Sequence, residues 1–434
     1  MSESLQNFDL SRIGEEMYSL AVELYPICRS ITGSGFRQSL EILQKTIPLQ
    51  LTEIPSGTQV FDWVVPKEWN VSDAYVKDPS GKMIIDFKES NLHLLNYSAP
   101  VHSHFSLYEL REHLYSLPET PDWIPYRTSY YAEKWGFCLT DRQLASLPEG
   151  DYEVRIDTSL KSGTLTYGEC VLPGQTTDEV LISCHSCHPS LANDNLSGMA
   201  LATFLASYLK SQPRRYTYRF LFIPGTIGSI TWLACNESII PRIKHGLVVT
   251  CVGDPGRSTY KKSRRGDAEI DRAVVHVLKH SGQDYQVRDF SPYGYDERQY
   301  CSPAFNLAVG SLSRTPNGGY PEYHTSADNL GLIQPVFLAD SFAKYLAVIE
   351  VLEHNHYYLN MNPKCEPQLG KRGLYGTLGG RKEIPDFEFA LLWVLNYSDG
   401  NFSLLDIAEK SNISFSVIMK AADALQMAEL LKQL

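Results

Sequence analysis

The stretch that decides the fold reads EVLISCHSCHPSLANDNLSG, residues 179–198. Its first part, Val180–Cys184, is a short apolar run of the kind that forms a buried strand. The run ends at His185, and a small polar loop with Asp194 follows. Apolar residues then recur at helical spacing, which predicts a helix over residues 196–211. Histidines and a carboxylate are therefore expected at the carboxyl end of a strand, where open α/β sheets bind ligands.

This polar loop carries the donors of a metal site. His185, His188 and Asp194 offer neutral imidazole nitrogens and a carboxylate, which are ligands that Zn²⁺ takes from proteins. The alternative is structural, with both histidines bonded to backbone groups and Asp194 capping the helix. Because all three residues follow the same strand, we favour the metal site. Cys184 lies in the apolar run and is assigned to the core, whereas Cys187 is a further ligand candidate.

Length and composition narrow the class of protein. The 434 residues are enough for two or three domains and a large core. No apolar run approaches the ~18 residues of a membrane span, and residues 1–10 lack the features of a signal peptide. Nine scattered cysteines suit a reducing cytoplasm, and a net charge of −11 disfavours nonspecific nucleic-acid binding. We therefore expect a cytoplasmic protein that binds neither membranes nor nucleic acids.

The main pattern predicts an α/β fold with a mostly parallel central sheet. From about residue 151, strand-like runs alternate with amphipathic helical stretches, which places helices on both faces of a sheet. Residues 9–46 are predicted to form two helices whose link contains Arg29, which we expect to be exposed. We assign residues 1–47 and 151–360 to this core. The predicted strands are Val180–Cys184, Arg219–Ile223, Leu247–Cys251 and Asn306–Val309, and the predicted helices cover 196–211, 267–281 and 335–354.

Two other regions differ from the core. Residues 48–150 contain short β-rich runs between turns, which predicts an inserted β domain. Residues 361–434 begin with a basic, glycine-rich linker and continue as three predicted helices, with Ser403 and Ser414 as N-caps. This spacing suits a winged-helix unit, but seven acidic residues against three lysines in 386–434 favour a packing or homo-oligomer role over DNA binding. The β-rich runs are Phe61–Val65, Ala74–Val76, Met83–Phe87 and Leu92–Tyr97, and the helices are Phe387–Leu395, Leu404–Lys410 and Phe415–Met427.

Polar residues elsewhere could complete the site. Asp254 follows the Leu247–Cys251 strand and is either a metal ligand or a residue of an Asp-Pro-Gly turn. A charged loop before the Asn306–Val309 strand could hold a substrate, or it is only solvated. A second polar loop, at residues 320–329, could supply the third imidazole that a site with three protein ligands needs. The candidates are Asp296, Glu297 and Arg298 in the first loop, and Glu322, Tyr323 and His324 in the second.

The order of these motifs resembles a known family. His185, Asp194-Asn195 and Tyr323-His324 follow one another as in the di-zinc aminopeptidases of the bacterial leucyl aminopeptidase and glutamate carboxypeptidase class. More closely, nearly the full chain is similar to aminopeptidase-like proteins labelled as polysaccharide-biosynthesis proteins. The resemblance implies a phosphorylase/hydrolase-like zinc-peptidase core, an inserted β domain and a winged-helix-like tail. The matching stretches are residues 25–33, 187–198 and 320–324.

The resemblance also implies roles for individual residues. His185 stands at the first zinc-ligand position, Asp194 at the bridging carboxylate and His324 at the last imidazole ligand. His188 belongs to the Cys-His-Pro of the closer group, and it either replaces His185 as a ligand or joins it. These roles imply a Zn²⁺ site built from two or three imidazoles and one carboxylate.

One departure from the family bears on activity. Where the peptidases have Glu-Glu, and the closer group has Glu-Thr-Ile-Gly-Ser, this chain has Gly225-Thr226-Ile227-Gly228-Ser229. The first glutamate is the general base and the second is a zinc ligand. Losing a general base lowers the rate by about 10²–10⁴. We therefore expect about one Zn²⁺ per chain, with Glu297 or Glu322 in place of the base.

Two functions follow from this reading. The first is a metal-dependent hydrolase of an amide bond at an amino-terminal or aminoacyl group, in which Arg298, Tyr323 and Asp296 bind a small-molecule or peptide-like substrate. The second is a biosynthetic enzyme that uses the same site for another acyl or amide reaction, or a binding module without catalysis. Gly225 weighs against the first function, because glycine has no side chain that could accept a proton.

Overall fold

The computed structural model describes residues 9–374 and 386–434. The chain divides into two compact units, a larger one of residues 10–266 and 286–342, and a smaller one that contains residues 267–285 and 343–434. Most of the predicted basic linker lies outside the described residues. Within the described ranges, no helix has both the length and the apolar character needed to cross a membrane.

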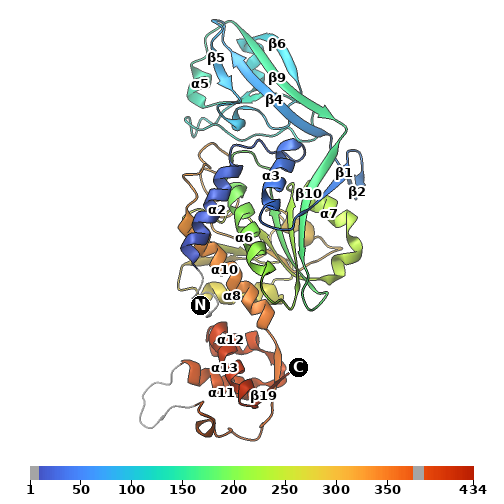
Figure 1. Ribbon diagram of the computed structural model, residues 1–434. Coiled ribbons are helices and arrows are strands. Elements are labelled where there is room, and N and C mark those ends of the chain that lie inside the picture. The colour runs from blue at the N-terminus through green and yellow to red at the C-terminus, as the bar shows by residue number, and fades with distance from the viewer. Residues whose placement is uncertain (1–8, 375–385) are drawn as a thin grey trace. The chain divides into compact units, whose positions relative to one another are not determined.

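An eight-stranded sheet forms the centre of the larger unit (Figure 1), in the order β1-β10-β12-β11-β13-β16-β14-β15. Its four middle strands, β12, β11, β13 and β16, run parallel, whereas β1, β10 and β14 pair antiparallel with their neighbours. The predicted α/β fold with a parallel centre is thus confirmed, and the antiparallel edges were not predicted. The strands are β1 (Gln50–Pro55), β10 (Thr164–Leu172), β11 (Glu179–His185), β12 (Thr217–Ile223), β13 (Ile243–Val249), β14 (Ser258–Lys261), β15 (Tyr285–Arg288) and β16 (Val309–Ser313).

Burial explains why the middle of the sheet forms. All residues of β11 are buried, as expected for a strand covered by helices on both faces. Helix α6 (Gly198–Lys210) packs on the sheet and against α2 (Leu10–Leu24), and both are seen in front of it in Figure 1. The buried residues of α2 recur at helical spacing, so one stripe of that helix faces the core. They are Ile13, Gly14, Met17, Leu20, Ala21 and Leu24.

Several predicted boundaries were wrong. The strand predicted at Asn306–Val309 begins only at Val309, and the run Leu92–Tyr97 forms a short 3₁₀ turn, Asn91–His93, instead of a strand. Short apolar runs do not distinguish such turns from strands, because period and composition are the same. The second predicted N-terminal helix is α3 (Ser34–Gln44), and the others of the larger unit include α7 (Ile227–Cys235) and α9 (Glu297–Tyr300).

A second sheet, of four strands in the order β5-β4-β9-β6, lies at the upper end of the larger unit in Figure 1. Its strand β9 buries the alternate residues Tyr152, Val154 and Ile156. One face of this strand is therefore packed, and the other faces solvent. This second sheet is the β-rich region that was predicted in addition to the α/β core. The boundaries of that region at residues 48 and 150 stay a prediction. The strands are β4 (Glu68–Lys77), β5 (Met83–Asp86), β6 (Val101–Ser106) and β9 (Asp151–Lys161).

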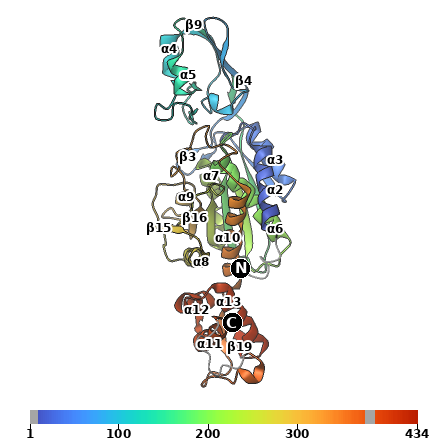
Figure 2. The same ribbon diagram turned by 90° about the vertical axis from the view of Figure 1, so that its left-hand side faces the viewer.

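The smaller unit contains a winged helix (Figure 2). The side chain of Ser403 accepts the N–H of Asp406 and caps α12, as predicted, whereas Ser414 makes no such side-chain bond. Helix α8 (Glu269–Lys279) belongs to the same unit: Arg272 pairs with Asp406 at 2.6 Å, and His276 accepts the N–H of Phe415 at 3.0 Å. The winged-helix elements are β17 (Tyr357–Asn360), α11 (Asp386–Tyr397), β18 (Asp399–Ser403), α12 (Leu404–Ser411), α13 (Phe415–Met427) and β19 (Leu431–Gln433), preceded by α10 (Pro335–His354).

Candidate metal centre

The candidate site is formed where β11 ends. His185 is the last residue of this strand, and His188 lies in the loop that follows. Asp194 lies in the irregular turn Ala192–Ser197 that leads into α6. All three side chains are buried, with 0% of Asp194 and His185 and 6% of His188 exposed. The local sequence thus brings two imidazoles and a carboxylate to the carboxyl edge of the sheet.

Asp194 is the centre of this group. Its Oδ1 lies 2.7 Å from Nε2 of His185, and its Oδ2 lies 3.1 Å from Nε2 of His324 and 3.9 Å from Nε2 of His188. Ligand atoms of His185, His188 and Asp194 all lie within 4.8 Å of one another. The alternative in which Asp194 only caps a helix is not what the structure shows, because both oxygens face imidazoles.

Electrostatics suits a cation at this position. Burial disfavours ionisation of Asp194, but the surrounding imidazoles, of which His185 and His324 hydrogen-bond to its carboxylate, outweigh burial and hold its pKa well below the ordinary value. Burial lowers the pKa of His188 well below its ordinary value, so that imidazole is neutral. An ionised carboxylate beside neutral imidazole is the donor state that divalent metals require. The residues present therefore fit a Zn²⁺ ion.

Aromatic rings line this group. The ring of Tyr126 lies 5.0 Å from His188 and 5.1 Å from His324, measured between ring centroids. Tyr323 stacks on His324 at 3.9 Å, and Tyr295 lies over His185 at 3.7 Å. Because 35% of the His324 side chain is exposed, the group opens to solvent on the side of His324. Tyr323, a predicted substrate contact, is therefore at the open side.

A tyrosine covers Gly225, the position at which the family resemblance implies a glutamate. A Cβ atom at Gly225 would overlap the Tyr295 hydroxyl and lie 2.6 Å from Cζ of that ring. The backbone N–H of Gly225 donates to the sulfur of Cys187 at 3.3 Å. Burial raises the pKa of Tyr295 well above its ordinary value, so the phenol keeps its proton. Burial also raises the pKa of Cys187 to about 12, so this thiol is protonated in the absence of metal.

The charged loop of residues 296–298 is mostly engaged elsewhere. Asp296 accepts the N–H of Thr226 at 2.7 Å and the hydroxyl of Ser229 at 2.8 Å, and burial raises its pKa to about 6. Glu297 pairs with Lys261 and accepts the N–H of Tyr295 at 3.1 Å. Arg298 is partly buried. Asp296 therefore supports the turn at Gly225–Ser229, and the negative charge of Glu297 is balanced by its ion pair with Lys261.

Asp254 and Glu322 also have defined places. The carboxylate of Asp254 accepts Asn193 Nδ2 at 3.1 Å, the N–H of Gly256 at 2.8 Å and the N–H and hydroxyl of Thr315. Through these hydrogen bonds, Asp254 holds the loop beside the His185, His188 and Asp194 group. This agrees with the alternative in which Asp254 belongs to an Asp-Pro-Gly turn. Glu322 is half-buried in the loop of His324, and its carbonyl accepts the N–H of Thr325.

Two residues outside the predicted set, Asp328 and Arg29, hold the site together. Asp328 accepts the N–H groups of Asn193 at 2.6 Å and Asp194 at 3.1 Å, and burial raises its pKa to about 7. Arg29, expected to be exposed, is fully buried, and its Nε donates to the carbonyl of His188 at 3.0 Å. Burial lowers the pKa of Arg29 to about 10. Only the fold reveals these contacts, because Arg29 and His188 are far apart in sequence.

Comparison with known protein families identifies two matching regions of the chain. Residues 18–355 match the family described as "Domain of unknown function (DUF4910)". The chain belongs to this family. Beyond the matched DUF4910 region, residues 356–433 match a winged helix-turn-helix family. The predicted winged-helix tail is thereby confirmed.

Relatives of this DUF4910 chain support the aminopeptidase-like fold. It is 56% identical, over 97% of both chains, to a Clostridium acetobutylicum protein named "Putative polysaccharide biosynthesis protein with aminopeptidase-like domain". A crystal structure of a "putative peptidase" from Clostridium acetobutylicum is 54% identical and superimposes with a TM-score of 0.94 over 98% of each chain. BSAP, a zinc aminopeptidase from Bacillus subtilis, has a TM-score of 0.57 at 12% identity, covering 78% of this chain and 94% of its own. The resemblance to aminopeptidase-like proteins is confirmed, and the Bacillus enzyme shares the fold.

Proposed function

We propose that this protein is a metal-dependent, aminopeptidase-like hydrolase of an amide bond at an amino-terminal or aminoacyl group. The observation that carries the proposal is the convergence of His185, His188 and His324 on the carboxylate of Asp194. The similarity to a protein named for an aminopeptidase-like domain, and the fold shared with a zinc aminopeptidase, support it.

About one Zn²⁺ per chain would be held by these three histidines and Asp194. When bound, Zn²⁺ supplies a Lewis acid that polarises a carbonyl group and lowers the pKa of water. Asp194 contributes the negative charge, and the neutral imidazole of His188 contributes a free nitrogen lone pair. The enclosing rings of Tyr126 and Tyr295 exclude water from the buried side.

Substrate would enter beside the exposed imidazole of His324, where Tyr323 offers a hydroxyl. Arg298 would bind a carboxylate group of the substrate. Of the two carboxylates considered as bases, Glu297 is neutralised by Lys261, so Glu322 is the better candidate. We propose a small-molecule or peptide-like substrate, a cytoplasmic protein and a homo-oligomer through the C-terminal unit.

A second function is favoured by the pair of Tyr295 and Gly225. A phenol that keeps its proton can donate a hydrogen bond to a developing oxyanion, but it cannot take a proton from water. This favours an acyl or amide reaction other than hydrolysis, or binding without turnover.

The test combines metal analysis with an amide-hydrolysis assay. The protein is purified without chelator, its zinc content is measured, and leucine p-nitroanilide hydrolysis is followed with the native protein and Asp194→Asn. The first function requires hydrolysis by the native protein that Asp194→Asn loses. Bound zinc without native hydrolysis favours the second function, and no bound zinc after zinc addition rejects both metal-dependent functions.

A further inference from the structure

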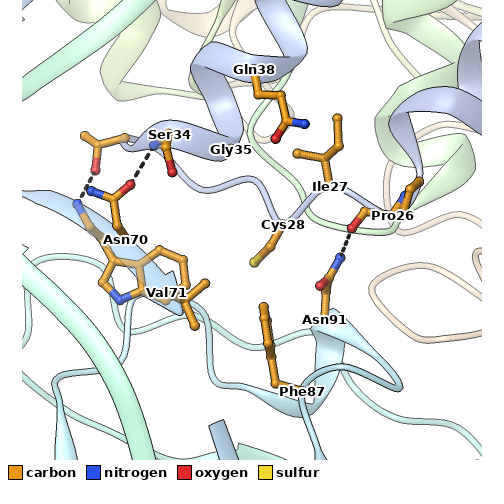
Figure 3. A pocket seen from close by; sticks show the side chains of 12 residues that line it. Pro26, Ile27, Cys28, Ser34, Gly35, Gln38, Asn70, Val71, Phe87 and Asn91 are labelled. Carbon is orange, nitrogen blue, oxygen red and sulfur yellow. Dashed lines mark hydrogen bonds between the residues drawn. The ribbon is translucent and has the colours of Figure 1, made fainter. Parts of the chain in front are cut away.

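A cavity of about 420 Å³ lies between the α2–α3 link and the second sheet, all within the larger unit. Its walls come from the start of α3, from β4 and from the residues after β5. Figure 3 shows Cys28, Gln38 and Phe87 approaching the cavity from different sides. Its volume falls within the range of ~300–1,000 Å³ typical of small-molecule sites.

The lining of this cavity is uncharged. Among its twelve lining residues, all within the described chain, none is Asp, Glu, Lys, Arg or His. The lining therefore offers no cationic side chain for the charge-assisted hydrogen bonds that strengthen recognition of phosphates and carboxylates. Its apolar surface comes from Ile27, Val71 and Phe87, among others.

Uncharged polar groups stand beside this apolar surface. The side chains of Gln38 and Ser34 have no hydrogen-bond partner among the described residues. Asn91 uses its NH₂ group on the carbonyl of Pro26 at 3.0 Å and on the hydroxyl of Ser190 at 2.7 Å, which leaves its carbonyl oxygen as an acceptor. Amides and hydroxyls offer donors and acceptors together. This lining matches a ligand with hydroxyl groups along its edge and apolar faces, as in a pyranose sugar.

The cavity wall is bonded to the loop of the metal centre at two points. Asn91, in the wall, donates to Ser190, which lies in the loop of His188. Arg29, which follows the wall residue Cys28, donates to the carbonyl of His188 itself. These two hydrogen bonds connect the cavity wall to the loop that presents His188.

We propose that this cavity binds a neutral saccharide and that its occupation is coupled to metal binding at His188. The saccharide site stands on the cavity alone, whereas the coupling rests on the proposed metal site. Coupling between two sites is reciprocal, so saccharide and metal each tighten the binding of the other by the same factor.

The binding test uses the metal-free full chain with glucose, N-acetylglucosamine and maltose, observed by ligand-detected NMR and calorimetry. Val71→Trp fills the cavity and is expected to weaken binding by at least about tenfold, since the bulky ring removes the space. Gln38→Ala removes one hydrogen-bonding amide and is expected to weaken binding about two- to tenfold. Gln175→Ala, an exposed glutamine outside the cavity, is the matched control and is expected to change nothing.

The outcomes decide the saccharide site. Binding of one neutral sugar that Val71→Trp abolishes supports it, and if Val71→Trp does not fold, Gln38→Ala decides. The saccharide site is overturned if none of the three sugars binds, or if Val71→Trp and Gln38→Ala bind sugar as tightly as the native protein. Tighter binding of glucose 6-phosphate than of glucose also overturns it.

The coupling test measures the zinc Kd by competition with a chelator, with and without saturating sugar. We expect the zinc Kd to tighten by about fivefold or more, within the range of about 5–150-fold usual for coupled sites, and the sugar Kd to tighten by the same factor with zinc. In Asn91→Ala, which removes the bond to Ser190, the factor falls towards one. An unchanged zinc Kd overturns the coupling. A protein that binds sugar but no zinc would instead reject the proposed function and leave the saccharide site supported.

Discussion

The ring of Tyr295 occupies the space above Gly225 that any side chain at position 225 would need. A Cβ atom there would lie 2.6 Å from Cε1 and Cζ of the tyrosine, well inside van der Waals contact. The same ring lies 3.7 Å from the ring of His185, between centroids. Glycine at 225 and tyrosine at 295 are therefore matched in size, and the packing leaves no space for a side chain at position 225.

Replacing Gly225 tests this match. Gly225→Glu alone should destabilise the fold by about 1–3 kcal/mol through overpacking, whereas Gly225→Glu with Tyr295→Ala should be less destabilised than the sum of the two single changes, by about 0.5–3 kcal/mol. Urea unfolding of the four proteins measures this difference. Additive changes would contradict the match, and Tyr293→Ala, at a side chain 82% exposed, serves as the control.

The same double variant tests catalysis. If the missing base limits hydrolysis, Gly225→Glu with Tyr295→Ala should raise leucine p-nitroanilide turnover by about 10²–10⁴, because a carboxylate regains the space for proton transfer. A double variant that folds and binds zinc but gains no turnover would show that the missing carboxylate does not limit the rate.

The proposed metal site draws its donors from two loops that are distant in sequence. We expect about one zinc per native chain, and a zinc Kd weakened more than about 100-fold in Asp194→Asn and His324→Gln, because each removes a direct donor. Removing zinc with a chelator should lower the Tm of the native protein but not of these variants. The matched control is His104→Gln, an exposed histidine of the second sheet. Native-like affinity in Asp194→Asn would contradict the site.

The packing of α8 on the winged helix should be sensitive to acid. Burial, with the charges of His280 and Lys279, lowers the pKa of His276 to about 4. The unfolded chain takes up this proton near pH 6.5 and the folded chain only near pH 4, so the stability is complete above pH 6.5 and is lost as pH falls towards 4.

We expect a loss of at most about 3 kcal/mol from this group over that interval. His276→Gln keeps an acceptor for the N–H of Phe415 but does not titrate, so its stability should fall less. Urea unfolding at pH 7 and pH 4.5 measures the difference, with the exposed His102→Gln as control. The assignment would be refuted if the native protein and His276→Gln lost the same free energy of unfolding between pH 7 and pH 4.5.

The winged helix should not bind DNA. Along α13, Lys420 is the one cationic side chain, and the N–H that starts this helix is bonded to His276. On α12, Asp406 and Glu409 pair with Arg272. Fluorescence anisotropy with a random duplex should show affinity weaker than the nonspecific range of about 10⁻⁴–10⁻⁶ M. Tighter binding that weakens steeply with salt would reverse this expectation.

The sequence predicted the long helices and the buried strands well, because their periodicity is strong. The helix predicted at 335–354 and the helix predicted at Phe415–Met427 have the bounds found in the structure. The edge strand β6 and its inner neighbour β9 were not predicted, since their residues vary in composition and do not form a continuous apolar run. The run Leu92–Tyr97 was misassigned, because a short apolar run carries no period.

By itself, the sequence determined the local part of the candidate site. Strand β11, its polar loop and α6 are adjacent in the chain, so His185, His188 and Asp194 are brought together by short-range structure. His324 was one candidate for the third imidazole among the polar loop residues, and the family resemblance assigned it to the site beside Asp194.

The tertiary structure alone decided which charged groups are free to act. Arg29 is buried against the His188 loop, Glu297 is neutralised by Lys261, and Tyr295 fills the space at Gly225. The physical reason is that the role of a charged or polar group depends on what lies within a few ångströms of it. Those neighbours come from loops far away in sequence, and only folding brings them together.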